Sequence, residues 1–231
     1  NTQMKTLFSE DLDTTRLISG IELYSSTKIT SEDTLLIFDE IQEVPKALAS
    51  LKYFYENAPQ YHIVCAGSLL GIALHNNTSF PVGKTEFLKL YPLSFSEFLM
   101  ATGKEQFARL LKENDMKMIT TFKETFTESL RYYYFIGGMP EVVKTWVEYH
   151  DYVRCQEVQD DIVVTYEDDF PKYKKNIDPV LLRQTLRSVA VQATKKIVYS
   201  KVGSDYKTVE VKKAVELLAL AGILHPVTHT D

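Results

Sequence analysis

The sequence predicts an α/β fold: a partial parallel sheet, then a helical region, then a segment like a winged helix. Two short apolar runs, at residues 34–38 and 62–66, flank a helical pattern, as in a strand–helix–strand unit. Helical spacing then continues to about residue 175, and a helix, a connector and a second helix follow. We therefore expect three parts, residues 1–100, 101–175 and 176–231.

The first expected strand is Thr34–Phe38, and its continuous apolar run is typical of a parallel strand covered by helices on both faces. Pro45, at a favoured first helical position, opens a helix to about Asn57. The second buried strand is His62–Ala66, so the unit is a right-handed βαβ crossover. The residues expected to face inward from the helix are Leu48, Leu51 and Tyr55.

The middle of the chain is expected to be mainly helical. A short helix should follow Gly67-Ser68, and residues Gly83–Leu90 alternate enough to predict a further strand. Ser94 begins an S-x-x-E capping box, which predicts a helix start. From there to about Lys175 the spacing is helical, with one break at residues 137–140.

The last part has the order of a winged helix-turn-helix. Asp178-Pro179 is a cap followed by proline at the first helical position. A short extended or turn segment over Ile197–Val202 leads to a helix over Lys207–Ala221, which Gly222 stops before a strand begins at Ile223. The apolar stripes of the two helices are Leu182, Leu186, Val189 and Ala193, then Val211, Val215 and Leu218.

The composition is that of an ordinary globular protein. The chain has 231 residues and a net charge of −5, and no apolar run reaches the ~18 residues that span a bilayer. Cys65 and Cys155 lie far apart and have no metal-ligand spacing, which favours a reduced, cytoplasmic protein without a membrane segment. Both ends of the chain fall within ordinary mixed sequence, so we expect a fragment.

Charge is distributed unevenly along the second half of the chain. Residues 151–170 contain seven acids and one base, whereas residues 171–213 contain eleven bases and three acids. Such a reversal indicates either a nucleic-acid or acidic partner for the basic segment, or two segments that neutralise each other.

The most informative residues are Asp39 and Glu40, which end the first apolar run. The carboxyl edge of a parallel sheet is where ligands of α/β folds bind. In a P-loop ATPase the first such carboxylate holds Mg²⁺ and the second polarises the attacking water. The alternative is a strand that simply ends in a solvated acidic turn. Ser68, after the next strand, is placed where ATPases of the additional-strand class put a polar residue near the γ-phosphate; a helix cap is its other interpretation.

Five motifs in order extend this pattern over nearly the whole chain: DEIQ at 39–42, AGSLLG at 66–71, PVGK at 81–84, LYPLSFSEF at 90–98 and YFIGGMPEVV at 134–143. Together they resemble the prokaryotic AAA-type ATPases that carry the domain of unknown function DUF4143 after the ATPase core. The resemblance implies a partial P-loop ATPase sheet, with ATP and Mg²⁺ as ligands of the full-length protein and a homo-oligomer as a possible state.

The same resemblance implies roles for individual residues. Asp39 matches the Walker B magnesium ligand, Glu40 the catalytic glutamate and Ser68 the sensor position. Lys84 stands where relatives commonly have Gly-Arg, so it is a candidate phosphate contact, although a lysine lacks the bidentate fork of arginine and could be a solvated strand residue.

No G-x-x-x-x-G-K-[ST] phosphate loop occurs in the 231 residues. Relatives place that loop upstream and continue into a further C-terminal part, so this chain is expected not to hydrolyse ATP alone. Two functions remain: an ATPase whose nucleotide state moves a DNA- or protein-binding module, or a winged-helix nucleic-acid-binding protein with a structural α/β part. The phosphate contacts in the second case are Lys195, Lys196, Lys201, Lys207, Lys212 and Lys213.

Overall fold

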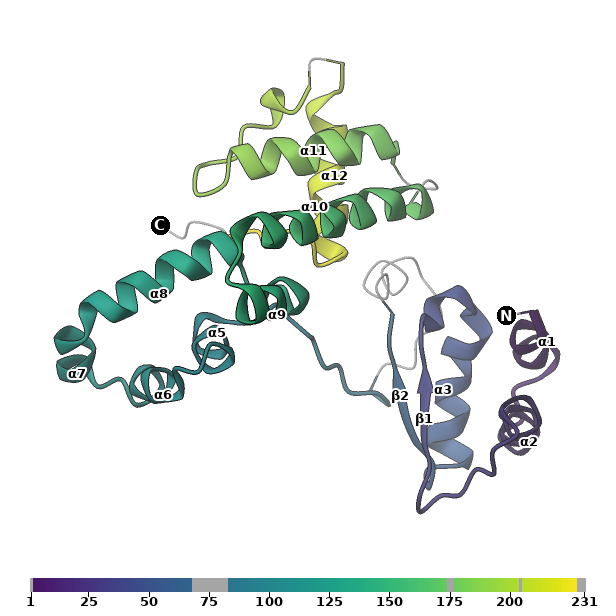
Figure 1. The fold of residues 1–231 in the computed structure, drawn as a ribbon. Helices are drawn as coiled ribbons and strands as arrows, with labels where there is room; N and C mark the ends of the chain where they lie inside the picture. The colour runs from purple at the N-terminus through teal and green to yellow at the C-terminus, as the bar shows by residue number, and fades with distance from the viewer. Residues whose placement is uncertain (1, 68–82, 174–176, 204, 228–231) are drawn as a thin grey trace. The chain divides into compact units, whose positions relative to one another are not determined.

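The computed structural model describes residues 2–67, 83–173, 177–203 and 205–227 (Figure 1). The chain divides into two compact units: residues 1–87 together with 180–231, and residues 88–179. The described residues are mostly helical, with a small two-stranded parallel sheet, which is consistent with the expected α/β class. Among these described ranges, no helix is both long enough and apolar enough to cross a membrane.

The sheet has the predicted parallel topology. Strand β1 (Leu35–Phe38) pairs with β2 (His62–Cys65), with Leu36 opposite Ile63 and Phe38 opposite Cys65. The short 3₁₀ turn η1 (Ile41–Glu43) and helix α3 (Pro45–Asn57) connect them. The predicted βαβ unit is confirmed, with the predicted bounds of its helix.

Only one face of this sheet is covered by the described residues, which corrects the expectation of two buried faces. Leu36 is 6% exposed and belongs to a core shared with α1 (Thr2–Glu10), α2 (Thr14–Ser25) and α3. On the opposite face Leu35, Ile37 and Val64 are 52%, 64% and 51% exposed. The three helices that share this core also contact one another. The apolar composition of the strands did not indicate which face of the sheet these helices would cover.

Two further expectations for this region are wrong. In α3, Leu48, Leu51 and Phe54 face the core, whereas Tyr55 is 57% exposed, because the helical period carries the buried stripe through residue 54. Residues 83–90 form a turn and an irregular segment instead of a strand; Leu88 is almost fully exposed and has no strand beside it among the described residues.

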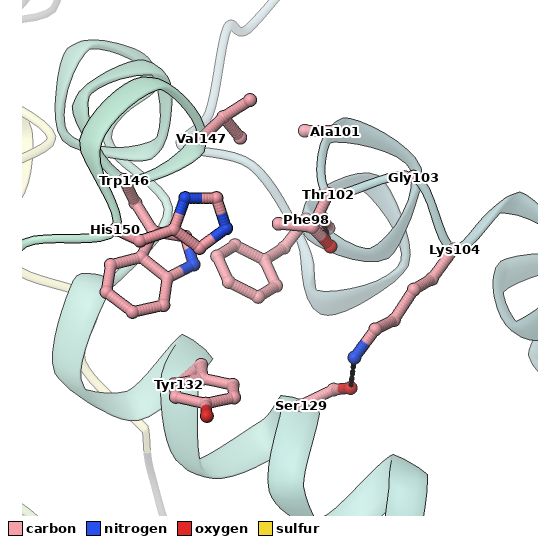
Figure 2. A pocket seen from close by; sticks show the side chains of 10 residues that line it. All are labelled: Phe98, Ala101, Thr102, Gly103, Lys104, Ser129, Tyr132, Trp146, Val147 and His150. Carbon is pink, nitrogen blue, oxygen red and sulfur yellow. Dashed lines mark hydrogen bonds between the residues drawn. The ribbon is translucent and has the colours of Figure 1, made fainter.

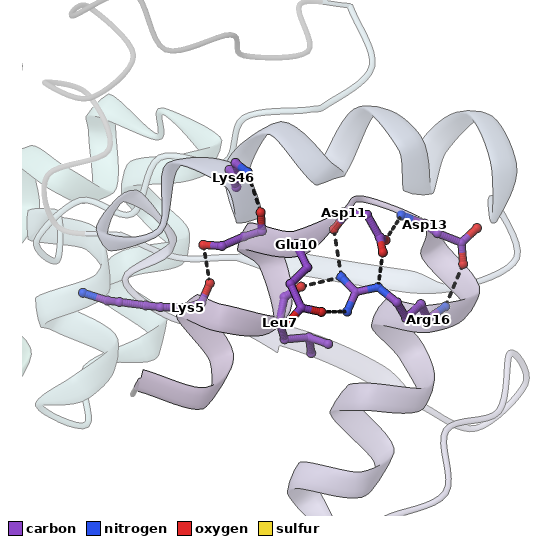
Figure 3. A network of polar contacts seen from close by, with 8 residues as sticks. Lys5, Leu7, Glu10, Asp11, Asp13, Arg16 and Lys46 are labelled. Carbon is purple, nitrogen blue, oxygen red and sulfur yellow. Dashed lines mark hydrogen bonds and ion pairs between the residues drawn. The ribbon is translucent and has the colours of Figure 1, made fainter.

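The turn between α1 and α2 is fixed by one arginine (Figure 3). The Arg16 guanidinium donates to the carbonyl oxygens of Leu7 and Asp11 at 2.6 and 3.1 Å and pairs with the carboxylates of Asp11 and Glu10. Lys46, in the first turn of α3, donates to the carbonyl oxygen of Ser9 at 2.5 Å. These contacts attach the end of α1 to the start of α3, just after the carboxylates of the expected site.

Residues 88–179 form a helical unit, and the mainly helical structure expected after Ser94 is confirmed. Its elements are α5 (Phe95–Ala101), α6 (Glu105–Glu113), α7 (Met116–Thr121), α8 (Lys123–Ile136), α9 (Pro140–Tyr149), α10 (Tyr152–Asp169) and the 3₁₀ turn η2 (Phe170–Tyr173). The capping box is confirmed: the Ser94 backbone N–H donates to Glu97 Oε2 at 2.7 Å, and this hydrogen bond lowers the pKa of Glu97. A core of Phe98, Ile136, Val142, Val143, Trp146 and Cys155 joins α5, α8, α9 and α10.

The predicted break between α8 and α9 is a close backbone contact. The Leu93 N–H donates to the Gly138 carbonyl oxygen at 2.6 Å, and the Tyr133 hydroxyl donates to the Leu93 carbonyl oxygen at 2.7 Å. A Cβ atom at position 138 would overlap that carbonyl and lie 2.9 Å from the Leu93 nitrogen. Glycine is therefore required here because two backbones approach each other directly.

Residues 179–227 contain the two predicted helices, α11 (Pro179–Val191) and α12 (Thr208–Leu220), with a 3₁₀ turn η3 (Tyr199–Lys201) between them. The α12 stripe is buried as expected, but α11 ends before Ala193, which is exposed. Residues 223–227 form no strand, which corrects the strand expected at Ile223. Among the described residues, the wing of a winged helix is therefore not observed.

Candidate functional site

Asp39 and Glu40 form an exposed turn directly after β1. The Glu40 N–H donates to Asp39 Oδ1 at 3.0 Å, and Glu40 itself has a left-handed backbone with φ +49°. Non-glycine residues adopt this conformation uncommonly, and such residues concentrate at functional sites. The turn presents two adjacent carboxylates at the carboxyl end of the strand.

The ends of the two strands are joined beyond the sheet itself. The Ala66 N–H donates to the Phe38 carbonyl oxygen at 2.9 Å, and the Ile41 N–H donates to the Ala66 carbonyl oxygen at 3.1 Å. These hydrogen bonds hold the Asp39–Glu40 turn against the end of β2. Ser68 follows Ala66 by two residues but lies outside the described residues, so its predicted place beside the carboxylates stays a prediction.

The structure places Gln42 at the candidate site, beside Glu40. Its side-chain Nε2 donates to Glu40 Oε2, while its Oε1 is buried with no hydrogen-bond partner. The amide therefore orients the Glu40 carboxylate from within η1. Sequence reasoning used Gln42 only as part of a motif; its spacing of two residues from Glu40, on the same turn, is the signal that could have indicated this role.

The donor set fits a magnesium ion in part. Mg²⁺ is commonly bound through one or two carboxylates, with water and substrate phosphates completing its octahedron. Asp39 and Glu40 supply such carboxylates, and in the part of the chain that the structure describes no cluster of three or more His, Cys, Asp or Glu side chains could hold a metal by itself. The backbone cradle for phosphate is not supplied by a phosphate-loop motif within the 231 residues.

Lys84 is not brought together with these carboxylates. Its ammonium pairs with Glu56 and lies 5.6 Å from the centre of the Tyr55 ring, and this pairing lowers the pKa of Glu56. Glu56 is in the last turn of α3, which returns toward the start of β2. Thirteen helical residues span roughly 20 Å, so Lys84 contacts the far end of the helix that begins beside Asp39 and Glu40.

The six lysines proposed for nucleic-acid contact are all exposed, and within the described ranges none makes an ion pair. Lys201 ends η3, and Lys207 precedes α12, where its backbone N–H donates to Glu210 Oε2 at 2.8 Å. Lys212 and Lys213 are exposed residues of α12 and lie on the side of the helix away from its buried stripe. The structure thus gathers Lys201, Lys207 and the α12 pair on two contacting elements.

The aromatic run of residues 132–135 has two interpretations, a packing plug or a surface on which bases stack. Tyr132 and Tyr133 are partly buried and pack against the core of residues 88–179. Tyr134 and Phe135 are 76% and 70% exposed. Packing therefore accounts for two of the four side chains.

A βαβ unit with paired carboxylates at the carboxyl edge of its sheet is an arrangement that P-loop NTPase-like domains share with other α/β folds. Comparison with known families agrees: residues 2–99 match the family described as AAA domain, and we conclude that they carry an AAA-type ATPase domain. Such a domain implies use of a nucleotide, typically with Mg²⁺.

Residues 127–231 match the family described as Domain of unknown function (DUF8612). The expected DUF4143 domain is not shown by this comparison. The motif at residues 137–141, which suggested DUF4143, lies inside the range matched to DUF8612. Neither the curated proteins nor the solved structures gave a match to the chain.

Proposed function

We propose that residues 1–100 supply the magnesium-binding and water-activating edge of an ATP-hydrolysing site. The observation that carries this proposal is the Asp39–Glu40 turn, held to the end of β2 by the hydrogen bond from Ile41 to Ala66. In this role Asp39 holds the cation, directly or through water, and Glu40 accepts a proton from the attacking water. Bound Mg²⁺ would neutralise charge on the phosphate oxygens.

Gln42 has a positioning role in this scheme, because its amide donates to the Glu40 carboxylate. Ser68 is proposed as the polar residue that orients the water near the γ-phosphate. A phosphate loop must then come from outside the 231 residues. Lys84 is a weak candidate for phosphate contact, since it already pairs with Glu56.

The test uses a polypeptide in which a phosphate-loop segment accompanies residues 1–231. Glu40→Gln should keep ATP binding but lower the hydrolysis rate by on the order of 100-fold or more, because an amide of equal size cannot accept the proton. Asp39→Asn should instead weaken magnesium-dependent ATP binding. Steady-state hydrolysis and equilibrium nucleotide binding separate the two effects.

Glu43→Gln is the matched control, because Glu43 is an exposed carboxylate in the same turn. It should leave binding and hydrolysis unchanged. Unchanged hydrolysis in Glu40→Gln would refute the role of Glu40. Tight Mg²⁺-ATP binding by the 231-residue chain alone would refute the proposed origin of the phosphate contacts.

A second candidate function is nucleic-acid binding by residues 176–231. The nucleotide state of the ATPase domain would control this binding, or residues 176–231 would bind independently of it. It is favoured by six exposed lysines against two carboxylates within residues 195–213. Duplex DNA binding should be measurable near ~50 mM salt and fall steeply as salt rises, because phosphate contacts release counterions.

The double variant Lys212→Gln/Lys213→Gln should weaken this binding and reduce the slope of affinity against salt by about two contacts. The control Lys117→Gln/Lys123→Gln makes the same change of charge on exposed residues of α7 and α8. DNA binding that ignores salt, or an equal effect of both double variants, would exclude this interface.

A further inference from the structure

Residues 88–179 contain a pocket that belongs to neither the proposed nucleotide site nor the basic segment. It has a volume of about 470 Å³ and lies between α5, the α5–α6 turn, α8 and α9 (Figure 2). This volume is within the range of small-molecule sites, roughly 300–1,000 Å³. The aromatic and polar side chains that line it include Phe98, Lys104, Ser129, Tyr132, Trp146 and His150.

One end of the pocket is aromatic. The Tyr132 and Trp146 ring centres are 5.3 Å apart, and the Trp146 and His150 ring centres are 5.2 Å apart. The Phe98 ring lies between this group and Lys104 in the close view. Such a wall favours a flat apolar ligand, because aromatic rings prefer tilted or offset contacts with other rings.

The opposite end of the pocket carries Lys104, whose backbone is fixed by a helix-terminating motif. The Gly103 N–H donates to the Met100 carbonyl oxygen at 3.1 Å, and the Lys104 N–H donates to the Leu99 carbonyl oxygen at 2.8 Å. Gly103 has φ +74°, as the Schellman motif requires. The motif ends α5 and places Lys104 directly before α6, at the rim of the pocket.

Among the described residues, the Lys104 ammonium has one hydrogen-bond partner and no counter-ion. It donates to the buried Ser129 hydroxyl at 2.7 Å, and that hydroxyl in turn donates to the Thr125 carbonyl oxygen at 2.8 Å. Within the described part of the chain no carboxylate lies within 4.0 Å of this ammonium. Two of its three N–H donors therefore stay available, in a partly buried and mainly apolar setting.

A negative charge lies behind the aromatic wall, on Glu128, which contacts Tyr132 but does not itself line the pocket. The Tyr132 hydroxyl donates to Glu128 Oε1 at 3.3 Å, and the Glu128 charge raises the pKa of Tyr132. A ligand carboxylate would be repelled at that hydroxyl and attracted at Lys104. A phosphate would need more donors than one lysine supplies, and a ligand cation would meet the ammonium.

We propose that this pocket binds a small aromatic carboxylate, with its ring against Trp146 and Tyr132 and its carboxylate on Lys104. This assigns a ligand site to the helical unit, separate from the residues proposed for nucleotide chemistry. A free acid is favoured because aromatic side chains and the Lys104 ammonium line the same small pocket.

Trp146 is the only tryptophan of the chain and lines the pocket, so its fluorescence reports binding directly. The probes are phenylacetate and its neutral isostere phenylacetamide. Phenylacetate should change the Trp146 emission saturably, and phenylacetamide should bind at least about tenfold more weakly, as expected for loss of a charge-assisted hydrogen bond. Absence of a saturable change, or equal binding of both probes, would overturn the proposal.

Lys104→Gln should remove the preference for the acid, whereas Lys112→Gln, an exposed lysine in the last turn of α6, should retain it. Val147→Phe narrows the pocket from α9 and should weaken both probes equally. Circular dichroism checks that each variant is folded, and saturation-transfer NMR on the wild-type protein provides a readout independent of tryptophan. A preference for phenylacetate that survives Lys104→Gln would also overturn the assignment.

Discussion

The Ile41 N–H donates a hydrogen bond to the carbonyl oxygen of Ala66 over 3.1 Å. Ala66 directly follows β2, and Ile41 follows β1 after the two-residue turn of Asp39 and Glu40. Their contact fixes the Asp39–Glu40 turn to the end of β2, where the chain continues to Ser68. The geometry of the proposed site therefore depends on a hydrogen bond between backbone atoms, which any side chain at these two positions could accompany.

The two faces of β1 should differ in their contribution to stability. Leu36→Ala should lower the free energy of unfolding by about 2–5 kcal/mol, because it opens a cavity in the core with α1, α2 and α3. Leu35→Ala, one residue earlier on the exposed face, should cost less than about 1 kcal/mol. Urea denaturation followed by circular dichroism measures both. Equal costs would contradict the one-sided packing of the sheet.

Gly138→Ala should destabilise residues 88–179 by more than about 2 kcal/mol. The added Cβ would overlap the Leu93 carbonyl, which also accepts the hydrogen bond from the Tyr133 hydroxyl. Lys144→Ala, at an exposed position of α9, should change stability by no more than about 0.5 kcal/mol. Urea unfolding followed by Trp146 fluorescence reports on this unit. A neutral Gly138→Ala variant would show that the Leu93 contact is dispensable.

The two cysteines should be unreactive in the folded protein near neutral pH. Burial raises the pKa of the Cys65 thiol to about 11, and burial also raises the pKa of Cys155, which is 2% exposed. At pH 8 about 0.1% of Cys65 is then thiolate, the reactive form. Iodoacetamide labelling, located by peptide mass spectrometry, should be slow until about pH 10 for Cys65 and slow throughout for Cys155. Labelling of the native protein at the rate of the unfolded chain would contradict both assignments.

Stability should fall in acid partly through Asp11. The Arg16 side chain, by hydrogen bonding and charge, lowers the pKa of Asp11 below its unfolded value. The stabilising contribution is therefore present above about pH 4 and lost as pH falls through the lower, folded pKa. Asp11→Asn should therefore show a smaller fall in melting temperature than the wild-type protein between pH 5 and roughly pH 3.

Asp33→Asn is the control for this experiment, since it removes an exposed carboxylate from the loop before β1. It should leave the acid dependence of the wild-type protein in place. An identical acid profile for wild-type protein and Asp11→Asn would show that the Arg16 network does not couple to folding.

Local sequence signals predicted most of the elements. Pro45 and the following apolar spacing predicted α3, the Ser94 capping box predicted α5, and Pro179 predicted the start of α11. Residues 137–140 predicted only the break that precedes α9. The carboxylates after β1 and the pairing of the strands followed from the same βαβ pattern. These features are determined by neighbours in sequence, because caps, fixed proline dihedrals and helical periodicity act over a few residues.

The tertiary structure decided what local patterns leave open. An apolar run such as residues 35–38 has the same composition whether one face or both are covered, so the exposure of Leu35 and Ile37 depended on where α1 to α3 pack. Residues 83–90 alternate like a strand but lack a ladder partner among the described residues. Lys84 was separated from Asp39 by the length of α3, and Lys104 and Trp146 were brought into one pocket from different helices. The sequence by itself thus determined most of the elements and the place of the two candidate carboxylates after β1, whereas side-chain environments depended on contacts between residues far apart in the chain.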